Sequence, residues 1–118
     1  MSATQNSSIS PFTPNTVFEP LAPTQTIGKP FAPQVKISGL VTSQLKNAEV
    51  HVSIVNMDTS TILDRAVGKT DSKLGVQVDA LIFNNIRLAG GLPPLTNCIL
   101  RIVIAGKTFD SNPFSIQQ

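Results

Sequence analysis

The sequence has few of the residues on which most protein chemistry depends. Its 118 residues include no tryptophan and no tyrosine, one cysteine and one histidine. A single cysteine excludes a disulfide within the chain, and one cysteine with one histidine cannot form a zinc site. Charged residues make up 14% of the chain, against about 25% in a typical domain. The net charge of +2 does not by itself indicate nucleic-acid binding.

The residues that are present suggest no catalytic arrangement. His51 alternates with valines that we expect in the core, so its side chain should face solvent. Nucleophilic catalysis needs a base beside a serine, cysteine or threonine, and the acidic residues form no close pair. Gly68-Lys69-Thr70 is similar to the end of a phosphate-binding loop, but Leu63 stands where that loop needs a glycine. We expect no enzyme, no cofactor or metal, and no small-molecule substrate.

Long apolar runs are also missing. No stretch approaches the roughly 20 apolar residues that cross a bilayer. Residues 1–10 are polar and uncharged, without the apolar centre of a secretory signal peptide. The sequence therefore predicts an intracellular protein, nuclear or cytoplasmic, with no membrane partner.

The strongest structural signal is the run Cys98–Ala105, which is rich in β-branched and other aliphatic residues. Alternation places Cys98 and the even-numbered residues after it on one face, and Arg101 with its apolar neighbours on the other. Both faces are largely apolar, which predicts a central strand covered on both sides. Cys98 itself is expected in the core as a small apolar residue.

Other segments show the short alternating pattern of half-buried strands, most clearly Glu49–Asn56. A polar loop is expected over residues 68–75. The fold expected from this pattern is all-β: an immunoglobulin-like antiparallel β-sandwich of about seven strands, with a small jelly roll or open barrel as the alternative. The expected strands cover residues 34–41, 49–56, 61–67, 76–83, 86–88, 98–105 and 108–116.

Residues 1–33 differ from the rest of the chain because they hold six of its nine prolines. Such a segment cannot form a helix, so we expect a Pro/Ser/Thr-rich arm, extended or disordered, before a β-sandwich domain at 34–118. Apolar residues recur in the arm, and Phe12, Phe18 and Phe31 are the candidates for contact with a partner.

Basic residues supply the only sign of a nucleic-acid surface. Arg65, Lys69 and Lys73 are expected in or near loops. If these loops gather at one end of a sandwich, their side chains form a modest surface for phosphate groups. The alternative is that they are ordinary solvated loops.

Several short motifs between residues 33 and 116 are similar to those of a known family. They are Pro33-Gln34-Val35-Lys36-Ile37, the spaced valines Val50, Val52 and Val55, the loop Val67-Gly68-Lys69, and Phe83-Asn84-Asn85-Ile86 followed by Leu88. Together they resemble the Rel-homology sandwich of transcription factors, and the closing segment from Leu100 to Ile116 resembles velvet domains.

This resemblance implies an immunoglobulin-like fold that binds DNA through loops at one end, usually as a dimer. It implies that Lys69, which lies in the matching loop, contacts the phosphate backbone of the DNA. The recognition loop rich in arginine and tyrosine that precedes this region in Rel proteins has no counterpart, so no base-reading residue is transferred.

Three functions follow from these observations. The preferred one is a non-enzymatic binding module of the transcription-regulator type, a homo-oligomer that contacts DNA or a protein partner through its loops. The alternative is a structural assembly protein, such as a viral coat or accessory subunit, whose arm contacts neighbouring subunits. A third is an adaptor recognised through its Pro-Phe motifs, among them Asn112-Pro113-Phe114, which matches the tripeptide that EH domains bind.

Overall fold

The residues that the computed structural model describes are 12–27, 35–40, 45, 48–70, 76–77, 80–83 and 88–117. They form strands, turns and connecting segments, and none of them lies in a helix, which confirms the all-β class. The described part holds ten strands, where about seven were expected. The proline-rich segment adds two strands, and two expected strands are each divided in two. The strand expected over residues 86–88 is described only at Leu88, as a single bridge.

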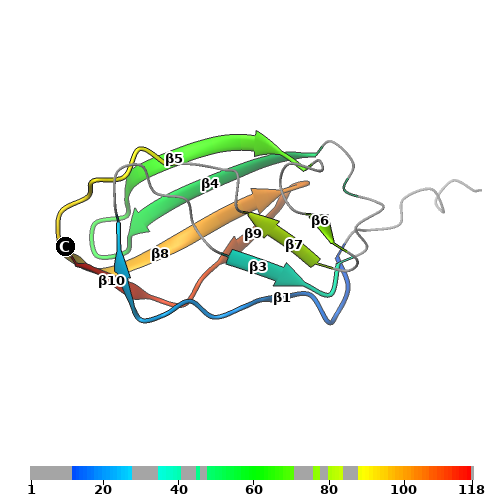
Figure 1. Cartoon of the computed structure of the whole chain (residues 1–118), viewed down its shortest axis with the longest axis horizontal. Helices are drawn as coiled ribbons and strands as arrows, with labels where there is room; N and C mark the ends of the chain where they lie inside the picture. The colour runs from blue at the N-terminus through cyan, green and yellow to red at the C-terminus, as the bar shows by residue number, and fades with distance from the viewer. Residues whose placement is uncertain are drawn as a thin grey trace, which may run out of the picture.

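Six strands form the larger sheet, in the order β2-β10-β8-β4-β5, with β9 paired to β8. Figure 1 shows β5, β4 and β8 as long neighbouring strands, with β5 at the border. The strands of this sheet are β2 (Thr24–Thr26), β4 (Glu49–Asn56), β5 (Thr61–Lys69), β8 (Leu95–Ile104), β9 (Lys107–Asp110) and β10 (Phe114–Gln117).

Strand β8 lies at the centre of this sheet, as its aliphatic run predicts. One of its edges pairs with β4 from Cys98 to Ile104. Its other edge is shared, because β9 pairs with the stretch from Arg101 to Ile104 and β10 with the stretch from Leu95 to Cys98. The strand begins at Leu95, three residues earlier than expected.

The burial of β8 differs between its two faces. Cys98, Leu100, Ile102 and Ile104 are all buried, which confirms the expected core face and the core position of Cys98. On the other face Ile99 is buried, but the residues from Arg101 to Val103 on that face are half-buried. The expectation of cover on both sides was therefore wrong for this half of the outward face, where no described strand lies over the sheet.

Four strands form the smaller sheet, in the order β1-β3-β7-β6, and all of its pairs are antiparallel. The alternating Val35 and Ile37 of β3 are buried and join the cluster formed by the buried residues of β4 and β8. The two sheets therefore share one apolar core. The smaller sheet consists of β1 (Val17–Phe18), β3 (Val35–Ser38), β6 (Val76–Gln77) and β7 (Ala80–Phe83).

Residues 12–27, within the expected arm, contribute one strand to each sheet. Strand β1 pairs antiparallel with β3, and β2 pairs with β10 in parallel, the one exception to the antiparallel pairing expected of the described strands. The side chain of Asn112 links the two ends of the chain. It accepts the N–H of Leu21 (2.8 Å) and donates to the C=O of Leu21 (3.0 Å).

Gly39 is expected to mark a bulge or a close approach of backbone, and the close approach is confirmed. Its φ is +74°, and a Cβ at this position would lie 2.2 Å from the carbonyl oxygen of Asn15. The hydroxyls of Thr13 and Thr16 both donate to the Gly39 carbonyl, at 2.8 and 3.0 Å. Glycine is needed here because any side chain would collide with the backbone of the segment before β1 and displace it.

Two tight turns complete the larger sheet. The sequence predicts a turn at Met57-Asp58-Thr59-Ser60, and the structure confirms it between β4 and β5. Asn56 Oδ1 stabilises this turn by accepting the N–H of Thr59 at 3.1 Å. The sequence predicts a hairpin turn at Gly106-Lys107, but the hairpin between β8 and β9 turns one residue earlier, at Ala105 and Gly106. Both have positive φ (49° and 79°), as a type I′ turn requires, so Lys107 already pairs with Ile104.

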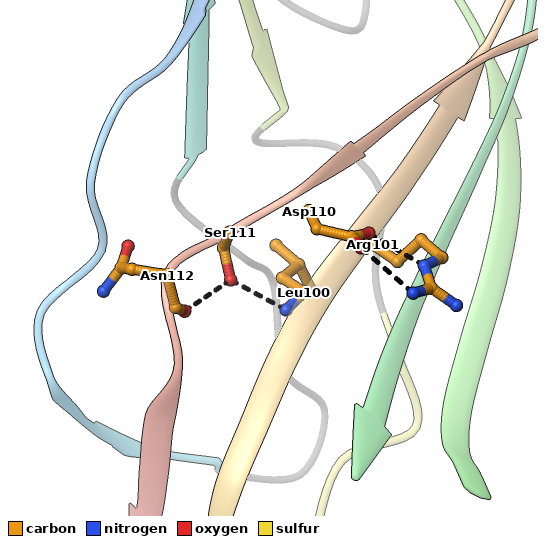
Figure 2. Close-up of polar contacts among 5 residues, drawn as sticks. All are labelled: Leu100, Arg101, Asp110, Ser111 and Asn112. Carbon is orange, nitrogen blue, oxygen red and sulfur yellow. Dashed lines mark hydrogen bonds and ion pairs between the residues drawn. The ribbon is translucent and has the colours of Figure 1, made fainter. Parts of the chain in front are cut away.

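Pro113 divides the last expected strand into β9 and β10, as a proline without an N–H predicts. Ser111 maintains contact with β8 at this break: its backbone N–H donates to the carbonyl of Leu100, and its hydroxyl accepts the N–H of Leu100 at 2.9 Å (Figure 2). The same hydroxyl donates to the carbonyl of Asn112 at 2.8 Å. The two strands can therefore pair in succession with one edge of β8.

Candidate binding surface

The histidine and the cysteine take part in no metal or nucleophilic arrangement of the described residues. Among these residues no three His, Cys, Asp or Glu side chains are close enough to hold a metal ion. His51 is exposed, as expected, and its Nε2 lies 2.7 Å from Oε1 of Glu49. Burial raises the pKa of the Cys98 thiol above its ordinary value, so the thiol stays protonated at neutral pH.

Two of the three basic residues expected to contact nucleic acid lie together in β5. Arg65 and Lys69 are exposed, and both belong to the strand. The expectation that the polar loop starts at Gly68 was wrong, because Gly68 and Lys69 continue the ladder with β4, opposite Val50 and Glu49. Lys73 lies outside the described residues.

A buried threonine explains why β5 continues past the expected boundary. The hydroxyl of Thr70 accepts the backbone N–H of Ala48 at 2.7 Å and donates to the carbonyl of Leu45. The backbone N–H of Thr70 donates to the carbonyl of Ala48, also at 2.7 Å. Thr70 is 2% exposed, so these bonds fix the end of β5 against the segment that precedes β4.

The outward face of the larger sheet consists of rows of directly opposed side chains. One row contains Val67, His51 and Val103, from β5, β4 and β8. Opposed side chains in antiparallel strands share a face and lie about 5 Å apart at Cβ, so each row forms a continuous surface.

The neighbouring row contains Arg65, Ser53, Arg101 and Asp110, from β5, β4, β8 and β9.

Charges near the middle of the sheet are compensated within this face. Arg101 binds Asp110 through two hydrogen bonds, Nε to Oδ1 at 2.8 Å and an amino nitrogen to Oδ2 at 3.0 Å (Figure 2). This contact raises the pKa of Arg101 above its ordinary value.

Charges at the border of the sheet are not compensated in this way. The ion pairs between described residues are Glu49–His51 and Arg101–Asp110. Arg65 and Lys69 therefore form no ion pair with any residue that the structure describes. Between them Val67 is 56% exposed, one of five exposed large apolar side chains among the described residues. The outward face of β5 thus presents cation, apolar group and cation at alternate residues.

The outer backbone edge of β5 is partly capped. Asp64 Oδ1 accepts the N–H of Arg65 at 2.9 Å, and Oδ2 accepts the N–H of Gly90 at 2.8 Å. The Arg65 N–H therefore points away from β4, and alternation gives the same orientation to Val67 and Lys69. Thr70, an even-numbered residue, donates its N–H toward the β4 side, in agreement with this alternation.

Beyond this cap, β5 pairs only with β4 among the described strands. The backbone groups of Val67 and Lys69, with the carbonyl of Arg65, face outward along the edge. A stretch that no described strand pairs with can accept a further strand from another chain.

Two of the three phenylalanines expected to contact a partner lie against the chain's own core. Phe12 and Phe18 are half-buried and pack on the apolar cluster. The ring of Phe12 lies 5.4 Å from that of Phe109, and Lys107 Nζ lies within 6 Å of both ring centres. Phe31 lies outside the described residues.

The Asn112-Pro113-Phe114 tripeptide is likewise part of the fold. Phe114 is 4% exposed in β10, and the Asn112 side chain is bonded to Leu21. A tripeptide held in this way is not presented to an EH domain. The structure therefore gives no support to the adaptor function through this motif.

Three features of the surface were missed by reasoning from sequence. Asp64 lies within the expected strand 61–67, and its alternation pattern does not indicate that its carboxylate caps the edge of that strand. Ile62 and Val67, both more than half exposed, were treated as ordinary strand residues. The available signal was the presence of charges inside a strand pattern, which is typical of edge strands.

Comparison with known proteins finds no matching family model, no similar curated sequence and no similar solved structure. Within the described part of the chain, no helix has the length and apolar character to span a membrane.

Proposed function

We propose that this chain is a non-enzymatic binding module that recognises an extended segment of a protein partner by adding it as a strand beside β5. The observation that carries this proposal is the combination of an outward-facing backbone edge and exposed side chains over Arg65–Lys69. Backbone hydrogen bonds along such an edge supply affinity, and the flanking side chains supply specificity.

We propose an immunoglobulin-like sandwich as the architecture of this module. It is supported by two sheets that share one apolar core and by the resemblance to Rel-homology and velvet domains. In this proposal the border of the larger sheet, rather than the loops, provides the binding surface.

A nucleic acid is the second candidate partner, favoured by the absence of ion pairs between described residues and Arg65 or Lys69. These residues are four positions apart on a strand, about 13 Å. Two phosphate contacts give weak binding with a log–log salt slope of about −2. Fluorescence anisotropy with a duplex DNA at 20 to 200 mM salt tests this candidate. Tight binding with a steep slope would favour nucleic acid over a protein strand.

Proline substitutions test strand addition directly. Val67→Pro removes an N–H that faces outward, so it blocks an added strand while preserving the ladder with β4. A displayed library of random linear decapeptides is selected on the native chain and then assayed on the Val67→Pro variant. We expect the selected peptides to lose binding to the variant. Peptides that bind both proteins equally, or a library that yields no binder, would contradict the proposal.

A further inference from the structure

The pattern of side chains along β5 specifies what kind of strand can bind there. Resting on the proposed strand addition, we infer that the partner is a protein segment with acidic, apolar and acidic residues at alternate positions. The acidic residues pair with Arg65 and Lys69, and the apolar residue covers Val67. Each added side chain lies opposite one of these three, at a Cβ distance of about 5 Å.

The charges of the face favour this partner. Arg65 and Lys69 are exposed and form no ion pair with a described residue. Glu49 lies directly opposite Lys69 in β4, but its carboxylate is 2.7 Å from His51. An acidic side chain on the free side of β5 therefore meets cations that the rest of the described face does not neutralise.

The apolar position in the middle of the pattern favours an aliphatic partner residue. Val67 is 56% exposed, although His51 lies opposite it in β4. A β-branched side chain on an added strand would pack against Val67 and remove part of its apolar surface from water. A polar or small residue there would leave that surface exposed.

A second copy of β5 does not supply the complementary charges in an antiparallel pairing at this edge. Two identical antiparallel strands are related by a two-fold axis normal to the sheet. Centred on Val67, this pairing places Arg65 opposite Lys69, and centred on Arg65 it places two arginines together. Like charges directly opposite each other destabilise a strand pair. Other antiparallel registers place Arg65 or Lys69 opposite uncharged residues, because the alternate residues of β5 that share their face include no acidic one. Homotypic pairing therefore leaves both cations without an acidic partner.

No other segment of this chain supplies the required pattern. Its seven acidic residues are Glu19, Glu49, Asp58, Asp64, Asp71, Asp79 and Asp110, and no two of them are four positions apart. The matching strand therefore lies outside these 118 residues, and we infer that a partner protein supplies it. The pattern reads the same in both directions, so it allows the partner strand either orientation.

Synthetic heptapeptides with blocked ends test the inference. The acidic probe is TETVTET, the basic control is TKTVTKT, and TETGTET lacks the apolar centre. Binding is measured by NMR titration of the full chain at 20 mM and 150 mM salt. We expect TETVTET to bind at least about tenfold more tightly than TKTVTKT, with TETGTET in between. Equal binding of the acidic and basic peptides would overturn the inference.

Charge reversal provides the decisive variant. The double substitution Arg65→Glu with Lys69→Glu should transfer preference to TKTVTKT. Lys36→Glu, a charge reversal at one exposed site of the smaller sheet with half the total charge change, should leave the preference for TETVTET unchanged. The milder pair Arg65→Gln with Lys69→Gln should abolish discrimination, and it serves if the reversal impairs folding. A preference that does not follow the charge of β5 contradicts the inference.

The two proposals can fail separately. If library peptides require the edge of β5 but show no acidic pattern, strand addition stands and the inferred partner chemistry is wrong. If TETVTET binds Val67→Pro as tightly as the native chain, its site lies elsewhere and the inference is wrong. If no probe and no library peptide binds, both proposals fail.

Discussion

Strands β8 and β5 belong to one sheet and are separated only by β4, yet they differ in how fully they are paired and buried. β8 is paired along both edges, and its core face is buried from Cys98 to Ile104. β5 is paired by described strands on one edge only, and five of its nine residues are exposed. The comparison separates residues that stabilise the sheet from residues that control what the sheet can contact.

The charges of β5 fit its position at the border. A long flat apolar edge invites uncontrolled pairing with other chains, and charged residues along the edge oppose it. Asp64 caps the edge, while Arg65 and Lys69 make it selective by charge. β8 needs no such residues because its neighbours enclose it.

The largest expected difference between the two strands concerns apolar truncation. Ile102 in β8 is 0% exposed, whereas Ile62 in β5 is 54% exposed. Ile102→Ala should lower the free energy of unfolding by about 2–5 kcal/mol, and Ile62→Ala by less than about 1 kcal/mol. Urea unfolding followed by circular dichroism measures both. Similar losses would mean that β5 is covered in solution.

The next largest effect is expected from proline substitutions at neighbouring residues of β5, whose backbone N–H groups point in opposite directions. The backbone N–H of Ala66 points toward β4, whereas the backbone N–H of Val67 points away from β4 along the outer edge. Ala66→Pro should cost about 1–3 kcal/mol because a ladder bond to β4 is lost, whereas Val67→Pro should cost clearly less. Thermal unfolding of the two variants compares them. The opposite order would show that the outer edge of β5 is paired.

Burial of the Cys98 thiol in β8 predicts that the free energy of unfolding depends on pH. Its pKa is raised above the ordinary value of 9.0, mainly by burial, so the unfolded chain loses this proton first as pH increases. The contribution to stability is complete below pH 9 and declines as pH rises above it. Urea unfolding between pH 7.5 and 10.5 should show this decline.

Cys98→Ala is the reference for this effect, because other groups titrate equally in both proteins. The difference in unfolding free energy between the two should shrink at alkaline pH. A difference that stays constant would show that the thiol titrates alike in the folded and unfolded chain.

The smallest effect is expected from the ion pair on the outward face. Arg101 and Asp110 bond through two contacts, but both side chains are more than a third exposed. A double-mutant cycle with Arg101→Ala and Asp110→Ala should give a coupling of about 0.2–1 kcal/mol, weaker at 1 M salt. A coupling above 2 kcal/mol would place this pair in a shielded site and weaken the contrast with Arg65.

Local patterns predicted the elements that local forces decide. The alternation of Glu49–Asn56 gave β4 with its bounds, and the aliphatic run gave the centre of β8. The stop at Pro113 and the close approach at Gly39 also follow from the chemistry of those residues.

The features that could not be predicted from the sequence depend on contacts between residues far apart in the chain. The end of β5 depends on Thr70 bonding to Leu45 and Ala48, and no periodicity signals that contact. The segment 12–27 joins both sheets through partners far along the chain. The candidate surface was found in part: Arg65 and Lys69 were chosen for their charge, but their shared face follows from register.

The parallel pairing of β2 with β10 has a consequence for the order of folding. Leu21 and Asn112 are 91 positions apart, so the ribosome must release Asn112 and β10 before β2 can dock. Contacts that close so long a loop form late and slow the overall rate. During synthesis residues 21–27 therefore remain without their partner strand until β10 has been released, whereas β1 can pair with β3 much earlier.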